Sequence, residues 1–140
     1  MRFTVCDIEK DFSLVGEYLN EKIEEGKNII LLRGDLGAGK TTFVKHFMSY
    51  LGGEIADVDS PTFSIVNTYD STNKPIHHFD LYRLSSAEEI EEIGFMEYID
   101  SGNLCFIEWP QKIAEFLPPN QVVNLDITVS LEQCRDFVFS

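Results

Sequence analysis

The sequence predicts an α/β domain in which a mostly parallel β-sheet, extended by an antiparallel hairpin, lies between two layers of helices. Two short, uninterrupted apolar runs, at residues 29–32 and 104–107, are typical of strands that are buried on both faces of a parallel sheet. Helical periodicity flanks the first run, at residues 8–23 and 43–51. Because 140 residues suffice for one core and are too few for two, we expect a single domain over residues 1–140.

The first three elements follow from apolar periodicity and from the glycines that end it. One face of an amphipathic helix is formed by Ile8, Phe12, Val15, Leu19 and Ile23. Gly26 ends this helix, and the apolar run at residues 29–32 then predicts a buried strand. A second helix is indicated by Phe43, Val44, Phe47, Met48 and Leu51, and Gly52 ends it. The predicted order is therefore strand, glycine-rich loop, helix.

A hairpin and a short acidic helix are expected next. Residues 62–83 are rich in β-branched and aromatic side chains on both sides of a turn-like segment at 71–74, so we predict an antiparallel pair of strands. Ser85 and Ser86 are candidate N-caps of a helix that Gly94 ends. The glutamates of this helix indicate either a solvated face or an acidic patch for a basic partner.

The C-terminal third predicts three more strands. Residues 103–109 read as a second buried strand that ends in a carboxylate, and Pro118 and Pro119 mark the loop after it. Residues 122–130 and 134–140 are expected to form two antiparallel strands at the edge of the sheet.

Composition and charge exclude several classes of function. The chain has 24 acidic and 11 basic residues and a formal net charge of −13, so most of its surface would repel a nucleic-acid backbone. We therefore expect no stand-alone binding of DNA or RNA. No stretch approaches the ~20 apolar residues of a membrane span. The N-terminus also lacks the apolar run of a signal peptide, so we expect a soluble, cytoplasmic protein.

The cysteines fit a reducing compartment. Cys6, Cys105 and Cys134 are odd in number and far apart, and they show neither a CxxC motif nor a metal-ligand spacing. Cys105 lies inside an apolar run and is expected to pack in the core.

The segment GDLGAGKT at residues 34–41 predicts a phosphate-binding loop. Gly34, Gly39, Lys40 and Thr41 satisfy the pattern GxxxxGK[ST] between a strand and a helix. Glycines allow successive backbone N–H groups to point at phosphate, the helix adds the positive end of its dipole, and lysine reaches the β- and γ-phosphates. Thr41 is the expected Mg²⁺ ligand, since Mg²⁺ prefers oxygen. The sequence thus predicts a P-loop that binds a nucleotide and Mg²⁺.

A P-loop also needs an acidic partner for the metal at the end of a neighbouring strand. Glu108 and Asp80 both come where an apolar run meets a loop, and either of them is a candidate for the direct metal ligand. Ser60 and Thr62 lie where nucleotide-sensing segments run, and they are either γ-phosphate contacts or capping hydroxyls. His77 and His78, without other ligands at metal spacing, are interpreted as structural.

The kind of P-loop protein is narrowed by what the sequence lacks. The segment at residues 73–76 departs from the guanine-reading Asn-Lys-x-Asp motif at its last position, which disfavours a GTPase. Four arginines and no spare length disfavour a kinase that must hold two phosphorylated substrates. A minimal ATP-binding domain that acts through a partner remains, with a small P-loop kinase or a non-hydrolytic ATP-dependent regulatory module as the alternatives.

Five ordered motifs closely resemble the TsaE family, bacterial P-loop ATPases of tRNA threonylcarbamoyladenosine synthesis. They are GDLGAGKTTF at residues 34–43, SPTF at 60–63, HFDLYR at 78–83, EIGFMEY at 92–98 and IEWP at 107–110. The resemblance implies a compact three-layer P-loop NTPase fold that binds ATP with Mg²⁺ and hydrolyses it slowly alone. It also implies the partners TsaD and TsaB, which with a TsaC-type enzyme modify adenosine 37 of tRNAs that read codons beginning with A. ATP hydrolysis would reset the TsaD–TsaB complex, and tRNA contact would be left to these partners.

The resemblance also implies roles for individual residues. The expected nucleotide contacts are Asp35, Leu36, Gly37, Ala38, Gly39, Lys40, Thr41, Thr42, Ser60, Thr62 and Trp109. The expected catalytic residues are Lys40, Asp80 and Glu108, and the expected metal ligands are Thr41, Glu108 and Asp80. Trp109 is either a nucleotide contact or ordinary packing, and Arg83 either stabilises transition-state charge or forms an internal salt bridge. One departure is Phe12, where the family often has a small hydroxyl residue near the base.

Overall fold

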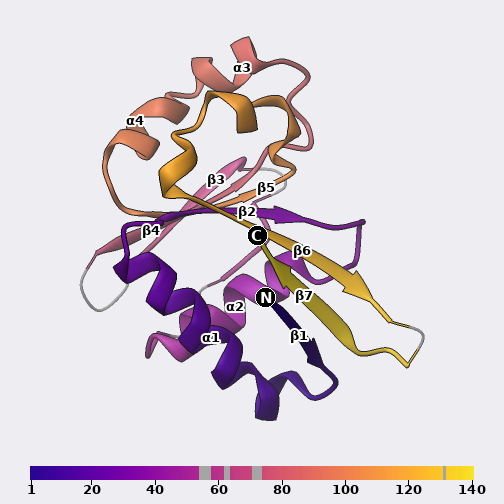
Figure 1. Cartoon of the computed structure of the whole chain (residues 1–140). Coiled ribbons are helices and arrows are strands. Elements are labelled where there is room, and N and C mark those ends of the chain that lie inside the picture. Colours follow the sequence, from indigo (N-terminus) through magenta and orange to yellow (C-terminus); the bar gives the residue numbers. More distant parts are fainter. Residues whose placement is uncertain (54–57, 62–63, 71–73, 131) are drawn as a thin grey trace.

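A computed structural model describes residues 1–53, 58–61, 64–70, 74–130 and 132–140. A single seven-stranded sheet, in the order β1-β7-β6-β2-β5-β4-β3, forms the centre of the molecule (Figure 1). The strands are β1 (Arg2–Val5), β2 (Ile29–Arg33), β3 (Val66–Asp70), β4 (Pro75–Asp80), β5 (Leu104–Glu108), β6 (Val122–Val129) and β7 (Arg135–Phe139). The helices are α1 (Ile8–Glu24), α2 (Lys40–Tyr50), α3 (Ala87–Glu92) and α4 (Phe95–Asp100), and short 3₁₀ turns run through η2 (Pro110–Lys112), η3 (Ala114–Phe116) and η4 (Pro119–Gln121).

The middle of the sheet is parallel and its two flanks are antiparallel. β2 pairs in parallel with both β5 and β6, and β4 pairs in parallel with β5. The hairpin partner β3 and the C-terminal strand β7 are antiparallel to their neighbours. The side chains of Ile29–Leu32 in β2 are buried on both faces, as their uninterrupted apolar run predicts. The predicted α/β class with a mixed, mostly parallel sheet is therefore confirmed.

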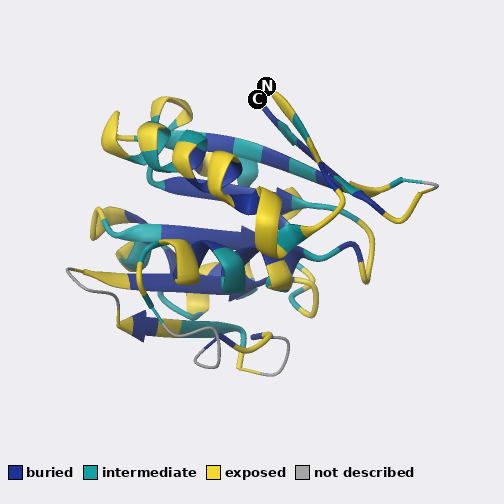
Figure 2. Ribbon diagram, turned by 90° about the horizontal axis from the view of Figure 1, so that it is seen from below, coloured by how far each residue is buried: buried dark blue, intermediate teal, exposed yellow. Residues whose placement is uncertain are grey.

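Helices cover both faces of the sheet, and each layer has its own core. On one face, α1 and α2 pack against the sheet, with the ring of Phe43 5.3 Å from those of both Phe12 and Phe137. On the other face, α3, α4 and the 3₁₀ turns cover β4 and β5, and Phe79 packs against Phe95. Figure 1 shows α3 and α4 on one side of the strands and α1 and α2 on the other, and in Figure 2 the strands are largely dark blue while the helices show yellow outer surfaces. These are the two helical layers that the sequence predicts.

Three features of the fold differ from the sequence prediction. The two C-terminal strands pair with each other as expected, but they are not at the edge, because β6 lies beside β2 and β1 covers β7. The edge strand β1 was not predicted, since its four residues carry no clear alternation. The helix α4 was also missed, because Gly94 ends α3 and at the same time stands as the N-cap of α4.

The predicted hairpin and acidic helix are confirmed within the described residues. β3 and β4 form the antiparallel pair, and residues 71–73 of the predicted turn lie outside the description. The hydroxyl of Ser86, one of the two candidate caps, accepts a hydrogen bond from the backbone N–H of Glu89 at 3.2 Å. Among the described residues, no helix combines the length and the apolar character needed to cross a membrane.

The carboxyl ends of the parallel strands bring the predicted acidic residues together. Asp80 at the end of β4 is in register with Glu108 at the end of β5, and Leu32, one residue before the end of β2, is in register with Glu108 from the other side. Residues in register on parallel strands point to the same face of a sheet. The side chains of Asp80 and Glu108 therefore share the face on which α2 begins.

Candidate functional site

The loop between β2 and α2 takes a conformation that its glycines make possible. Gly37 and Gly39 have φ values of 81° and 109°, in the left-handed region that side chains rarely adopt. At Gly34 the constraint is space, since a Cβ atom would lie 2.7 Å from the backbone oxygen of Ile127. The N-terminus of α2 has no side-chain cap and no acidic residue in its first turn. Its first N–H groups thus remain available to an anion.

Lys40, the first residue of α2, turns back over this loop. Its ammonium group donates hydrogen bonds to the backbone oxygens of Gly34 at 2.7 Å and Asp35 at 3.1 Å. It also lies 4.4 Å from the centre of the Trp109 ring, and the residue is only 6% exposed. Burial lowers the pKa of Lys40, while the nearby carboxylates, first that of Glu108, act in the opposite direction.

Glu108 is held by contacts from two other elements. Its Oε2 atom accepts a hydrogen bond from the hydroxyl of Thr41 at 3.1 Å and lies 2.5 Å from Nε2 of His78. The carboxylate is nearly buried, with 4% exposure. A buried carboxylate beside a threonine hydroxyl at the start of α2 offers hard oxygen ligands of the kind that Mg²⁺ prefers. Thr41 and Glu108 therefore fit the donor set expected of a Mg²⁺ site.

A cleft of about 280 Å³ opens where these elements meet. It is lined by Leu36, Gly37, Gly39, Lys40, Thr41, Thr42, Ser60, Asp80, Glu108, Trp109 and Arg135. The cleft thus contains the P-loop, both candidate acids and the tryptophan that follows β5. Open α/β sheets bind ligands at this position, outside the carboxyl ends of their strands.

The chain matches the sequence model of one protein family over most of its length. That family is described as threonylcarbamoyl adenosine biosynthesis protein TsaE, and the match spans residues 6–137. The chain belongs to the TsaE family.

Individual TsaE relatives and one solved structure agree with this assignment. The tRNA threonylcarbamoyladenosine biosynthesis protein TsaE of Rickettsia conorii is 50% identical over 100 residues, which are 71% of this chain and 57% of the relative. Its counterpart in Haemophilus influenzae is 41% identical over 99 residues, which are 70% of this chain and 62% of that protein. The chain therefore spans less than two thirds of either relative. The crystal structure of Bacillus subtilis YdiB matches with a TM-score of 0.68 and 27% identity, covering 99% of this chain and 83% of that one. The predicted three-layer P-loop NTPase fold is thereby confirmed.

Most residues expected from the TsaE resemblance lie in or beside the cleft. Asp35 and Ala38 do not line it, but their backbone oxygens accept hydrogen bonds from Lys40 and Arg135, respectively. Ser60 reaches the cleft wall, whereas Thr62 lies outside the described residues. Arg83 is exposed and is not among the lining residues.

Trp109 and Asp80 are each held in place by neighbours on the loop after β4. The ring of Trp109 packs against that of Tyr82, with their centres 4.9 Å apart. One carboxylate oxygen of Asp80 accepts a hydrogen bond from the backbone N–H of Tyr82 at 3.0 Å. The HFDLYR segment at residues 78–83 thus fixes one acid and supports the tryptophan between the loop and Lys40.

Arg135 in β7 was missed by sequence reasoning. It donates from Nε to the backbone oxygen of Ala38 at 2.8 Å and lines both the cleft and an adjoining cavity of about 200 Å³. That cavity also includes Cys6, Gln133 and Thr42. Only the strand order brings β7 next to the P-loop, so no local pattern could have indicated Arg135.

Phe12, the departure from the family pattern, is a core residue. Its ring packs against Phe43 at 5.3 Å and His46 at 5.7 Å, between α1 and α2. It lines neither the cleft nor the adjoining cavity. At this position the chain therefore has a side chain that packs between the two helices and does not line the cleft.

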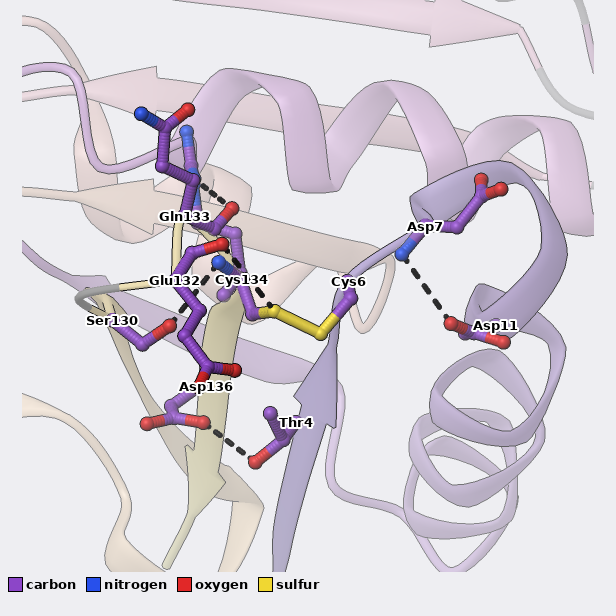
Figure 3. Close-up of a disulfide and its surroundings, with 10 residues drawn as sticks. Thr4, Cys6, Asp7, Asp11, Ser130, Glu132, Gln133, Cys134 and Asp136 are labelled. Carbon is purple, nitrogen blue, oxygen red and sulfur yellow. Dashed lines mark hydrogen bonds between the residues drawn. A yellow bond between two sulfur atoms is a disulfide. The ribbon is translucent and has the colours of Figure 1, made fainter.

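A disulfide joins the two ends of the chain (Figure 3), and its Cys6 lines the adjoining cavity. It links Cys6, directly after β1, to Cys134, directly before β7, across a sequence separation of 128 residues. The expectation that all three cysteines are reduced is therefore wrong for Cys6 and Cys134. The antiparallel pairing of β1 with β7 brings the two residues together, and no local pattern indicates that pairing. Cys105 is free and buried, as predicted.

Removing this disulfide should weaken the fold measurably. A cross-link over so long a loop restricts the unfolded chain, so the double variant Cys6→Ser/Cys134→Ser should lose about 2–5 kcal/mol of unfolding free energy. Denaturant titration measures this loss, and reductant should destabilise the wild-type protein but leave the double variant unchanged. Equal unfolding midpoints for the wild-type protein with and without reductant would contradict the disulfide.

Alkylation of cysteines gives a second readout. Burial raises the pKa of the Cys105 thiol to about 12 and should protect it from alkylation in the native state.

Proposed function

We propose that this chain is the ATP-binding and ATP-hydrolysing member of the machinery that makes threonylcarbamoyladenosine in tRNA. The observation that carries the proposal is the cleft in which the P-loop faces two buried carboxylates at the ends of neighbouring parallel strands. Membership of the TsaE family supplies the pathway, since the relatives are named for this modification.

The proposed binding mode uses groups that already converge on the cleft. The phosphates of ATP would accept hydrogen bonds from the N–H groups of the loop and of the first turn of α2. Lys40 would exchange its present contacts with the oxygens of Gly34 and Asp35 for the β- and γ-phosphates. The adjoining cavity, which shares Gly39, Thr42 and Arg135 with the cleft, leaves room for the nucleoside.

Mg²⁺ fits the same cleft through Thr41 and one of the two acids. These residues would hold Mg²⁺ beside the phosphates, where its positive charge would offset the charge on ADP, the leaving group when water attacks the γ-phosphorus. The hydroxyl oxygen of Thr41 lies 3.1 Å from Oε2 of Glu108, which favours Glu108 as the carboxylate that binds the metal. Asp80, in register with Glu108 on the next strand, would then hold and polarise the attacking water.

The proposed partners are TsaD and TsaB, and the proposed task of hydrolysis is to reset their complex between turnovers. The net charge of −13 makes direct tRNA binding unfavourable over most of the surface, so tRNA contact would be made by the partners. Slow hydrolysis by the isolated chain would be useful in such an arrangement, because ATP would be spent mainly when the partners are docked.

Release of free phosphate from ATP tests this function. We expect weak release by the purified chain with Mg²⁺, a several-fold rise when TsaD and TsaB are added, and little activity with GTP in place of ATP. Phosphate that appears on an acceptor instead of in solution would indicate a kinase. Tight ATP binding without any release, even with both partners present, would indicate a regulatory module and would overturn the proposal.

A further inference from the structure

A chain of hydrogen bonds runs through the interior from the segment at residues 58–61 to the P-loop helix. It starts at the backbone oxygen of Asp59, which accepts from the hydroxyl of Tyr69 at 2.9 Å. The Tyr69 oxygen lies 3.0 Å from Nδ1 of His78, and Nε2 of the same ring lies 2.5 Å from Oε2 of Glu108. Glu108 in turn accepts from Thr41 at 3.1 Å. The four side chains come from β3, β4, β5 and α2.

The hydroxyl of Tyr69 contacts both the segment at residues 58–61 and His78. It donates a hydrogen bond to the backbone oxygen of Asp59, which also accepts one from the amide of Asn67 at 3.3 Å. The Tyr69 oxygen shares a further hydrogen bond with Nδ1 of His78 at 3.0 Å. Together with the contact between Nε2 and Glu108, this bond holds the imidazole ring at both of its nitrogens. The ring is thereby kept with Nε2 directed at Glu108.

His78 is buried in a way that leaves its ring little freedom. The residue is 0% exposed, and the ring of Tyr69 packs beside it with 5.9 Å between centres. In the described part of the chain, every buried side-chain nitrogen and oxygen has a hydrogen-bond partner. Turning the ring would therefore break two buried hydrogen bonds at once, each of which is costly to leave unmade.

The neighbouring His77 provides an internal comparison. It lies on the opposite face of the same strand, where its ring packs against Tyr98 with 4.9 Å between centres. Its Nδ1 atom is 3.0 Å from the Thr68 hydroxyl, and Nε2 is 3.4 Å from the amide nitrogen of Asn103. None of these three partners lines the cleft. Of two adjacent buried histidines, one contacts an acid of the cleft and the other belongs to the packing of α4.

We propose that His78 is the positioning residue for the metal-binding carboxylate, and that Tyr69 ties this histidine to the segment that carries Ser60. By holding Oε2 of Glu108, His78 would determine how the carboxylate is presented beside Thr41. Substituting a residue that hydrogen-bonds to a metal ligand and orients it typically lowers metal affinity or activity by about 10–100-fold. The inference rests on the proposed function, in which Glu108 serves Mg²⁺.

Two substitutions at His78 separate positioning from packing. Glutamine places its amide nitrogen near the position of Nε2 and can still donate to Glu108, whereas asparagine places its nitrogen near that of Nδ1 and cannot reach Glu108. Tyr69→Phe keeps the ring and removes only the hydroxyl that orients His78. His77→Asn is the matched control, since it alters a buried histidine of the same strand on the other face.

The proposal is tested by measuring the affinity for ATP by calorimetry, once in EDTA and once with Mg²⁺. Only variants that unfold cooperatively on heating, and are therefore folded, are compared. The wild-type protein should bind more tightly with Mg²⁺. His78→Asn should lose about 10–100-fold of that gain with unchanged binding in EDTA, whereas His78→Gln should keep most of it. Tyr69→Phe should fall between these two, and His77→Asn should match the wild-type protein. A Mg²⁺ gain in His78→Asn equal to that of the wild-type protein, or equal losses in the asparagine and glutamine variants, would overturn the inference.

Two further results keep the inference distinct from the proposed function. Absence of ATP binding by the wild-type protein under both conditions would overturn the proposed function, and this inference with it. Nitrogen NMR of the histidine rings needs no nucleotide: we expect Tyr69→Phe to shift the Nδ1 signal of His78 and Glu108→Gln to shift its Nε2 signal. Signals of the His78 ring that neither substitution changes would overturn the proposed contacts even if ATP binds.

Discussion

Replacing Lys40 by alanine should abolish detectable ATP hydrolysis and weaken ATP binding strongly. The ammonium group is nearly buried at the P-loop, and its removal takes away the cation expected to face the β- and γ-phosphates. Losing one electrostatic contact to a transition state typically costs about 10²–10³-fold in kcat. Alanine also leaves the oxygens of Gly34 and Asp35 without the hydrogen bonds that Lys40 now donates. Phosphate release and calorimetric ATP binding measure both effects.

A control on the same helix makes this result specific. Lys45→Ala removes the same charge from α2 at a partly exposed position that does not line the cleft. The rate of ATP hydrolysis by this variant should therefore remain close to that of the wild-type protein. Thermal unfolding should show both variants folded. ATP hydrolysis by Lys40→Ala at a rate within a few-fold of the wild-type rate would show that the loop does not act as a phosphate-binding loop in catalysis.

Glu108→Gln is expected to have the second-largest effect, on metal-dependent hydrolysis. Glutamine has a similar shape and can still accept hydrogen bonds from Thr41 and His78, so the fold should persist. The neutral amide is a poor ligand for Mg²⁺ compared with a carboxylate. We expect hydrolysis to fall by about 10²-fold or more, since charge stabilisation at the phosphoryl group is lost. ATP binding in EDTA should remain.

A Mg²⁺ titration of Glu108→Gln beside Asp80→Asn distinguishes the roles of the two acids. If Glu108 is the direct ligand, its variant needs far more Mg²⁺ for half-maximal hydrolysis, whereas Asp80→Asn lowers the maximal rate at a similar Mg²⁺ requirement. The reverse pattern would assign the metal to Asp80. Glu115→Gln, an exposed change outside the cleft, serves as the control. Wild-type behaviour of both acid variants would contradict the proposed metal site.

Local sequence patterns were sufficient for the elements that build the cleft. The apolar run of β2, the glycines of the loop and the helical period of α2 are each encoded within a few residues, so their order and type could be predicted. Placing Asp80 and Glu108 together required one further rule, that the carboxyl ends of parallel strands share one edge of the sheet. The register of β4 with β5 agrees with that expectation.

Features that depend on long-range pairing escaped prediction. Arg135 reaches the P-loop because β7 pairs with β6, which lies beside β2, and Cys6 meets Cys134 because β1 pairs with β7. No local spacing reveals this strand order. His78 was interpreted as structural because it has no metal-ligand spacing. A usable signal was present, however: strand alternation puts His78 on the same face as Asp80 and His77 on the other.

The most direct test of the central claim is the number of modified tRNA molecules formed per TsaD–TsaB complex in a reconstituted reaction with the TsaC-type enzyme. With this chain, ATP and Mg²⁺ present, we predict repeated turnovers, and with Lys40→Ala in its place we predict no more modification than without the chain. Unchanged multiple-turnover modification with Lys40→Ala, or with the chain omitted, would contradict the claim that ATP in this cleft drives the cycle.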